Sequence, residues 1–82
     1  MTKKIKNGPF KLYFSDGTLQ VEGTIKDGKE DGLWKYYHKN GQLYLEKTYR
    51  DGKSDGLWKK YDENGQLEEE RTYKDGKLIF IS

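Results

Sequence analysis

Aromatic side chains recur at fixed spacing along the sequence, and they are the residues best suited to binding chemistry. Trp34 and Trp58 lie 24 residues apart, and Tyr13, Tyr37 and Tyr61 repeat at the same interval. Rings with cations beside them grip sugars, quaternary ammonium groups or unstacked bases. Large rings also supply the buried area of a thin structure. We favour the core for the tryptophans, and we keep all five rings as a candidate binding surface.

Groups suited to catalysis are few. His38 is the single histidine, and its counterparts 24 residues away are Phe14 and Asp62, so it reads as a variable residue at a strand end. The three serines lie in turns or at the terminus: Ser15, Ser54 and Ser82. Catalysis needs unlike groups that converge, whereas repeats spread like groups along a line. We therefore expect no catalytic residues and no enzyme activity.

Metal and cofactor sites are not expected either. The segments DGKEDG and DGKSDG place two aspartates four residues apart around glycine, but they lack the alternating oxygen ligands of calcium loops. Asp-Gly is common turn chemistry. The glycines are evenly spaced turn residues rather than a cluster that cradles phosphate before a helix. The sequence thus predicts neither a metal nor a cofactor.

Composition narrows the class of protein further. The 82 residues are 32% hydrophobic and 37% charged, with a net charge of +2 and no block of five like charges. This charge distribution does not predict nucleic-acid binding. The chain has no cysteine, and the opening MTKKIKNGPF has no apolar run behind its lysines. We expect a cytoplasmic location for the sequence as given, and a secreted or surface-attached one if a signal sequence was removed.

The chain contains three internal repeats, and we expect them to form one repeat domain over residues 1–82. Gly8, Gly32 and Gly56 open three copies at residues 8–31, 32–55 and 56–79, and residues 80–82 form a terminal edge. Each copy holds two runs of six to eight residues separated by Asp-Gly or Asn-Gly, which is a hairpin signal. The prediction is an all-β fold, an extended single-layer antiparallel β-meander of three 24-residue hairpin repeats plus a closing C-terminal strand.

Pairing register follows from the turn. If Asn40-Gly41 is a two-residue type I′ turn, residues whose numbers sum to 81 face each other, which pairs Lys35 with Glu46 and Tyr36 with Leu45. A three-residue turn with a bulge would shift this register by one. The two-residue register also predicts cation–π pairs and an aromatic residue over a strand glycine: Trp34 with Lys47, Trp58 with Arg71, and Phe10 over Gly23.

The same register divides the side chains between two faces. We expect the core on the first face, which becomes more polar towards the C-terminus and carries Phe10, Leu12, Phe14, Leu19, Val21, Ile25, Trp34, Tyr36, Leu43, Leu45, Tyr49, Trp58, Leu67 and Tyr73. The second face carries the Lys–Glu pairs, the threonines and the three repeated tyrosines. The tail DGKLIFIS departs from the repeat, because Phe80 stands where a copy would begin with glycine. Ile79, Phe80 and Ile81 then form either a seventh strand that self-associates or a cap folded under the sheet.

The repeats resemble a known family. GLWKYYHKNGQLYLEKTYRDGK and GLWKKYDENGQLEEERTYKDGK are similar to the bacterial MORN-repeat variant, over Gly8 to Lys77. The first copy departs from the pattern at Pro9-Phe10, Ser15 to Thr18 and Ile25, as a capping repeat would. The resemblance implies an extended single-layer sheet that serves protein association, with membrane or phosphoinositide contact for some relatives and an antitoxin label for many bacterial ones. Nothing in the sequence resembles kinase machinery, which some relatives are named for.

These observations lead to a functional hypothesis. We expect a non-catalytic module for protein–protein association, antitoxin-like or scaffolding, with a protein partner and with self-association through the C-terminal edge. The alternative is a binding module for anionic lipid headgroups or cell-surface glycans. Membrane contact has weak support, because Asp27, Asp51 and Asp75 cancel much of the field of the neighbouring lysines. Salt distinguishes the two hypotheses, since lipid-phosphate contacts weaken steeply as salt rises.

Overall fold

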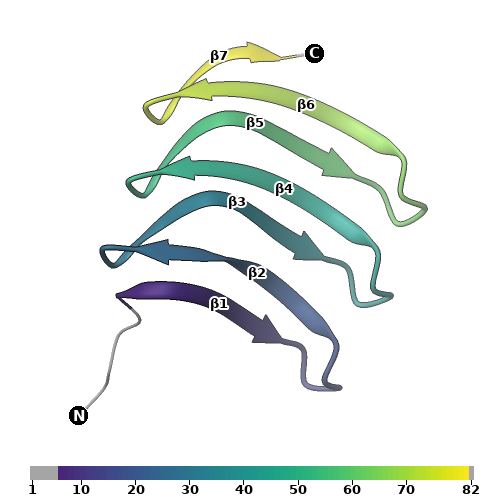
Figure 1. Cartoon of the computed structure of the whole chain (residues 1–82). Coiled ribbons are helices and arrows are strands. Elements are labelled where there is room, and N and C mark those ends of the chain that lie inside the picture. Colours follow the sequence, from purple (N-terminus) through teal and green to yellow (C-terminus); the bar gives the residue numbers. More distant parts are fainter. Residues whose placement is uncertain (1–5, 82) are drawn as a thin grey trace.

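The protein is a single open β-sheet. The computed structural model describes residues 6–81, which form seven strands: β1 (Asn7–Tyr13), β2 (Leu19–Lys26), β3 (Lys29–Tyr37), β4 (Leu43–Arg50), β5 (Lys53–Tyr61), β6 (Leu67–Lys74) and β7 (Lys77–Ile81). Each strand pairs antiparallel with the next, in chain order, and no helix occurs within the described residues (Figure 1). The sheet extends over 43 × 34 × 15 Å, which is one layer thick. The predicted antiparallel meander is confirmed.

Type I′ turns connect successive hairpins, at the Asp-Gly dipeptides at residues 27–28, 51–52 and 75–76. Asp27 and Gly28 both have positive φ, 52° and 78°, and the flanking residues Lys26 and Lys29 pair directly. The same geometry recurs at residues 51–52 and 75–76. Two consecutive positive φ values match the right-handed twist of a two-residue hairpin, and aspartate tolerates the left-handed region better than most residues. These turns join β2 to β3, β4 to β5 and β6 to β7.

The turn within each repeat differs from the two-residue turn expected at Asn40-Gly41, and that prediction was wrong. Only Gly41 has positive φ, 89°. The His38 N–H donates to the Gln42 carbonyl (2.8 Å), and the Gly41 N–H donates to the His38 carbonyl (3.0 Å), so three residues form the loop. The Asn40 side chain accepts the Gln42 N–H at 2.9 Å. This side-chain cap satisfies the backbone of a three-residue turn and leaves positive φ to the glycine alone.

The strand register nevertheless follows the prediction. Lys35 pairs with Glu46 and Tyr36 with Leu45, because a second irregularity between Tyr36 and Tyr37 offsets the extra turn residue. Equivalent irregularities follow Leu12 and Lys60 in the other two repeats. The two local departures cancel beyond the irregularity, and the face assignment made from the sequence holds there. The assignment was wrong for the leucines on the turn side of the irregularity, Leu19, Leu43 and Leu67, because they pair with Tyr13, Tyr37 and Tyr61 of the second face.

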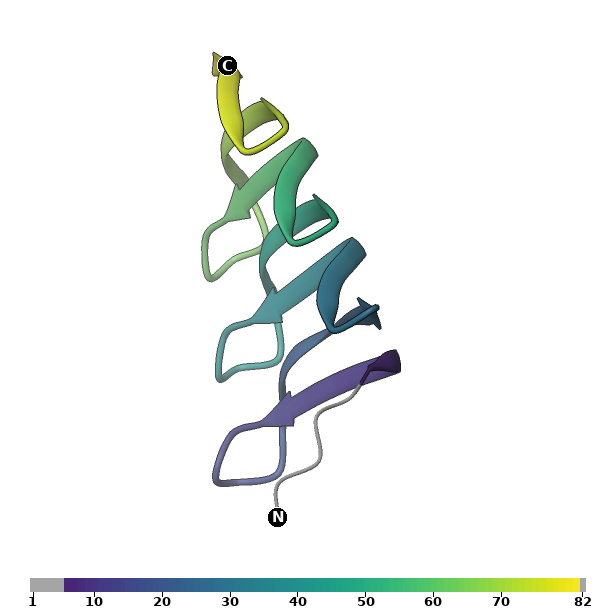
Figure 2. The same cartoon turned by 90° about the vertical axis from the view of Figure 1, so that its left-hand side faces the viewer.

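A larger bulge bends the sheet at the glycine that opens a repeat. Between β2 and β3 the register shifts by two residues after Glu22, where Gly32 has a φ of 79°. The shift recurs between β4 and β5, where Gly56 has a φ of 110°. Extra residues on one strand bend it and raise the local twist. The strands accordingly arch rather than lie flat (Figures 1 and 2).

The core lies on the predicted face, which we call the aromatic face: Phe10, Trp34, Tyr36, Leu45, Tyr49 and Trp58. Trp34 and Leu45 are its buried side chains, with 5% and 9% of their surfaces exposed. The Trp34 ring lies 5.4 Å from Phe10 and 6.2 Å from Tyr49, between ring centroids. It also covers Gly23, where a Cβ would lie 2.1 Å from the ring. A thin sheet thus builds its small core around one tryptophan.

The two expected cation–π pairs had different outcomes. Arg71 lies 4.3 Å above the Trp58 ring, as predicted. Trp34 and Lys47 pair in register, but the cation–π contact expected between them was wrong. Phe10, Tyr49 and the Gly23 backbone already surround Trp34, and Lys47 lies 5.6 Å above Tyr36 instead. Phe10 does pair with Gly23 in register, but Trp34 covers that glycine.

Candidate functional site

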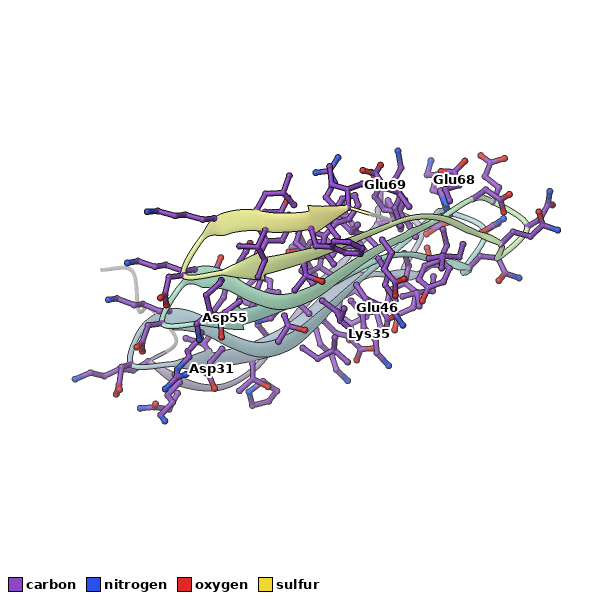
Figure 3. All side chains as sticks on the ribbon, turned by 90° about the horizontal axis from the view of Figure 1, so that it is seen from above. Asp31, Lys35, Glu46, Asp55, Glu68 and Glu69 are labelled. Atoms are coloured by element: carbon purple, nitrogen blue, oxygen red, sulfur yellow. The ribbon has the colours of Figure 1, made fainter. Side chains whose placement is uncertain are left out.

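The second face carries a regular row of charges, and we call it the ladder face. Adjacent strands place lysine opposite glutamate from β1 to β6, in the order Lys11, Glu22, Lys35, Glu46, Lys59 and Glu70. Figure 3 labels two neighbours of this row, Lys35 and Glu46. The Lys59 and Glu70 side chains approach to 3.7 Å. Alternating signs lower the repulsion that a row of like charges would create across neighbouring strands.

Tyrosine hydroxyls join the row on the ladder face. Tyr37 donates a hydrogen bond to Glu22 on the preceding strand (2.5 Å), and Tyr61 donates to Glu46 (2.8 Å). Both bonds span 15 residues of sequence and repeat one hairpin apart. Hydrogen bonds to a charged acceptor are stronger than neutral ones. The repeated tyrosines are thus structural links between hairpins.

Burial and these bonds shift the ionisation of the tyrosines. Burial and the hydrogen bond to Glu22 together raise the pKa of Tyr37 to about 12. The pKa of Tyr61 is raised to about 12 by burial and by Glu46. On the aromatic face, burial and the neighbouring Tyr49 raise the pKa of Tyr36 above its usual value. A neutral phenol that donates to a carboxylate resists losing its proton.

The five rings proposed as a binding surface do not form one surface. Trp34 and Trp58 lie on the aromatic face, where Trp34 is buried and Trp58 is half-buried under Arg71. Tyr37 and Tyr61 lie on the opposite face with their hydroxyls bonded. Tyr13 is 54% exposed, since β1 has no preceding strand within the described residues to supply a glutamate. The structure brings the tyrosines together in a line and separates them from the tryptophans.

Sequence reasoning missed two leucines on the ladder face. Leu33 and Leu57 are each 48% exposed and lie one hairpin apart. They flank a hollow of about 140 Å³ that Glu46, Thr48 and Lys59 complete. The signal was present, because strict alternation along β3 places Leu33 on the same side as Lys35. Leu33 and Leu57 thus place apolar surface beside the charge row.

A second hollow lies at the turn end of the first two repeats. Its volume is about 330 Å³, and its lining is Phe14, Gln20, Val21, Tyr36, Tyr37, His38, Lys39 and Tyr44. The His38 and Tyr44 rings lie 4.8 Å apart, and His38 Nε2 lies 3.4 Å from the Tyr61 carbonyl. Among residues 6–81, no carboxylate lines this hollow. The positions one repeat later carry charged groups in place of four lining residues: Lys60 for Tyr36, Asp62 for His38, Glu63 for Lys39 and Glu68 for Tyr44.

The predicted C-terminal edge is a strand. Ile79, Phe80 and Ile81 belong to β7, which pairs with β6 at the margin of the sheet and does not fold beneath it as a cap. Phe80 faces Thr72, and Ile81 faces Arg71, so large apolar groups point to both faces. Their surfaces are 54–62% exposed.

The residues described show no group of three side chains arranged to hold a metal ion. Within the same part of the chain, no helix has the length and apolarity to cross a membrane.

Comparison with known proteins identifies the repeat. A family model described as MORN repeat variant matches three segments, residues 6–27, 30–51 and 54–75, which cover most of the chain. The matched segments begin two residues before the glycines at positions 8, 32 and 56, and they omit the second residue of each Asp-Gly turn between repeats. No curated protein and no solved structure matches the chain.

Proposed function

The chain belongs to the MORN repeat variant family, and from this premise we propose that it is a non-catalytic module that binds a protein partner on its ladder face. The observation that carries the proposal is the pair of half-exposed leucines, Leu33 and Leu57, beside a hollow of about 140 Å³. A buried apolar anchor surrounded by polar groups is the usual centre of a protein interface. This hollow accepts one apolar side chain of a partner.

The charge row supplies selectivity around that anchor. Glu46 and Lys59 border the hollow with opposite charges. A partner must therefore present an apolar side chain with groups of both signs beside it, because like charges brought together cost affinity. The regular spacing of the hairpins repeats this combination of a leucine and opposite charges along the sheet. A single hairpin offers the combination only once.

The test compares leucines of equal exposure on opposite faces. Leu12 is 47% exposed on the aromatic face and is the matched control for the ladder-face leucines. Wild type, the double variant Leu33→Ser/Leu57→Ser and the variant Leu12→Ser are immobilised, and proteins captured from lysate of the source cells are identified at low and high salt. We expect a stoichiometric, salt-resistant protein that binds wild type and Leu12→Ser, with at least about 10-fold weaker binding to the double variant. Equal binding to all three chains, or an equal loss with Leu12→Ser, contradicts the assignment.

The narrower role within this proposal is that of a bacterial antitoxin-like or scaffold protein. An antitoxin of this kind acts by covering a toxic partner, so the same ladder-face contacts must carry neutralisation. The test is growth of cells that express the captured partner alone, with wild type, or with the Leu33→Ser/Leu57→Ser variant. Toxicity that only wild type relieves supports the antitoxin role, and a harmless partner that bridges to further proteins supports a scaffold.

A second candidate function is binding of a glycan or an anionic lipid headgroup in the 330 Å³ hollow. Its support is a lining rich in rings, with Lys39 and His38 and without a carboxylate, which suits a sugar carrying an anionic group. Sugar arrays and vesicles containing phosphatidylinositol phosphates are the probes, and Tyr44→Glu/Lys39→Glu converts two lining residues to those of the next repeat. Binding that this variant loses, and that salt weakens, supports ligand binding; binding that it keeps contradicts it.

A further inference from the structure

The outer edge of β7 is an open template for strand pairing. β7 bonds to β6 along one edge, and its other edge has no partner strand within residues 6–81. All five of its residues are exposed, and Lys77 is its only charged residue. Unpaired N–H and carbonyl groups along a strand with one terminal charge and no proline invite another strand.

Phe80 gives β7 a different backbone from β3 and β5. Gly32 and Gly56 take positive φ and allow a two-residue bulge, whereas Phe80 occupies that repeat position in β7. Phenylalanine is strained at positive φ, so the register between β6 and β7 shifts by only one residue. Phe80 then lies opposite Thr72, beyond Leu57 in the same row on the ladder face. A smaller bulge leaves a straighter edge for pairing.

We propose that β7 pairs antiparallel with β7 of a second copy, about a two-fold axis perpendicular to the sheet. The argument comes from strand direction. In a seven-stranded meander β1 and β7 run the same way, so joining β7 to β1 of another copy is either parallel or swaps the two faces of the sheet. Pairing β7 with β7 about this axis is antiparallel and keeps ladder face beside ladder face. It is the one arrangement at this edge that satisfies both conditions.

Charge and composition favour the same arrangement. Antiparallel pairing places the two Lys77 side chains at opposite ends of the joint, whereas parallel pairing in register stacks them. The four apolar residues from Leu78 to Ile81 then lie along the joint and bury apolar surface on both sides. β1 is the poorer edge for such pairing, because Pro9 lacks a backbone N–H. A closed two-fold pair also uses up the exposed edge, which an open chain of copies does not.

The dimer lengthens the partner-binding row. Leu33, Leu57 and Phe80 follow one another on the ladder face, and the two-fold axis continues the row into Phe80 of the second copy. The proposal does not depend on the partner, since β7 pairing requires only the chain itself.

The mass of the protein in solution tests the proposal first. Sedimentation equilibrium of the full chain should show a monomer of 9.7 kDa in exchange with a species of twice that mass. Phe80→Lys and Ile79→Pro should both shift the equilibrium to monomer by at least about 10-fold, with unchanged circular dichroism of the remaining sheet. The control Leu12→Lys adds one charge to a half-exposed leucine away from β7 and should leave the dimer intact.

Pairing direction is then read from single cysteines, since the chain has none of its own. In the register centred on Ile79, which overlaps all five residues, Ile79→Cys should cross-link to itself through a short bismaleimide. Lys77→Cys should cross-link to Ile81→Cys in a mixed sample and poorly to itself. A monomer at every concentration, open assemblies that grow without limit, self-linking at Lys77→Cys, or a dimer unaffected by both β7 variants would each overturn the proposal.

Discussion

Replacing Gly23 by alanine should destabilise the protein by about 2–4 kcal/mol, although alanine is usually harmless in a strand. The cause is Trp34, because the new Cβ would lie 2.1 Å from ring atom Cδ2, 2.3 Å from Cε2 and 2.6 Å from Cγ. Overpacking a filled site costs about 1–3 kcal/mol. If the ring were expelled altogether, the loss of stability could not exceed that of a Trp→Ala change, about 3–5 kcal/mol. Trp34 cannot move deeper, since Phe10 and Tyr49 already contact it.

The assay is urea unfolding followed by circular dichroism, with four chains in a double-mutant cycle. Trp34→Ala alone removes the core ring, and Gly23→Ala in that background should cost nothing or stabilise by up to about 1 kcal/mol, because alanine restricts the unfolded chain more than glycine. The two changes must therefore be strongly non-additive. Lys47→Ala is the control at the equivalent position one repeat later, where the side chain lies over Tyr36, and it should cost under about 1 kcal/mol. Additive effects, or a Gly23→Ala chain as stable as wild type, would refute the close contact.

Two further predictions concern the tyrosines and the bulge. The folded pKa values of Tyr37 and Tyr61 are about 12, above the usual value near 10, so their stabilising effect is complete below pH 10 and is lost as pH rises to 12. Alkaline titration at 295 nm should show late phenols that include Tyr37 and Tyr61 beside Tyr36, with one fewer in each of the variants Tyr37→Phe and Tyr61→Phe. A titration unchanged by both variants would contradict the assignment. Gly32 has a φ of 79° with open space where a Cβ would lie. Gly32→Val should therefore lower the free energy of unfolding by about 1–2 kcal/mol through backbone strain, and Gly32→Asn by clearly less, as measured by thermal unfolding. Equal losses of stability in the two variants would mean that packing, rather than φ, determines the effect.

Much of the fold follows from the spacing of residues along the chain. Asp-Gly and Asn-Gly at regular intervals predict hairpins, and alternation within the strands predicts the two faces. The turn type at Asn40-Gly41 did not follow, because the sequence does not show whether Asn40 takes positive φ or uses its side chain as a cap, as it does here. The register survived only because the irregularity at Tyr36 and Tyr37 offset that turn. Local signals identify a turn better than they determine its length.

The candidate site was harder to predict than the fold. The pairwise register places Phe10 opposite Gly23 but does not indicate that a ring from the next strand covers this glycine. To predict that Trp34 lies over Gly23, one would have to know of the bulge at Gly32. The exposure of Leu33 and Leu57 could be inferred from alternation with Lys35 and Lys59, but apolar residues in a thin sheet are readily assigned to its core. Faces can be deduced from a sequence, whereas contacts between non-paired strands cannot.

Divergence among the repeats favours the ladder face as the docking surface. On the aromatic face Tyr36 and Leu45 become Lys60 and Glu69 one repeat later, so the copies need not agree there to form the sheet. The Lys–Glu–Tyr network does recur, but its hydrogen bonds give a structural reason for that. Leu33 and Leu57 also recur, and each leaves nearly half of its surface exposed, so burial explains little of their identity. A leucine that repeats where folding gains little is consistent with our proposal that a partner contacts both copies.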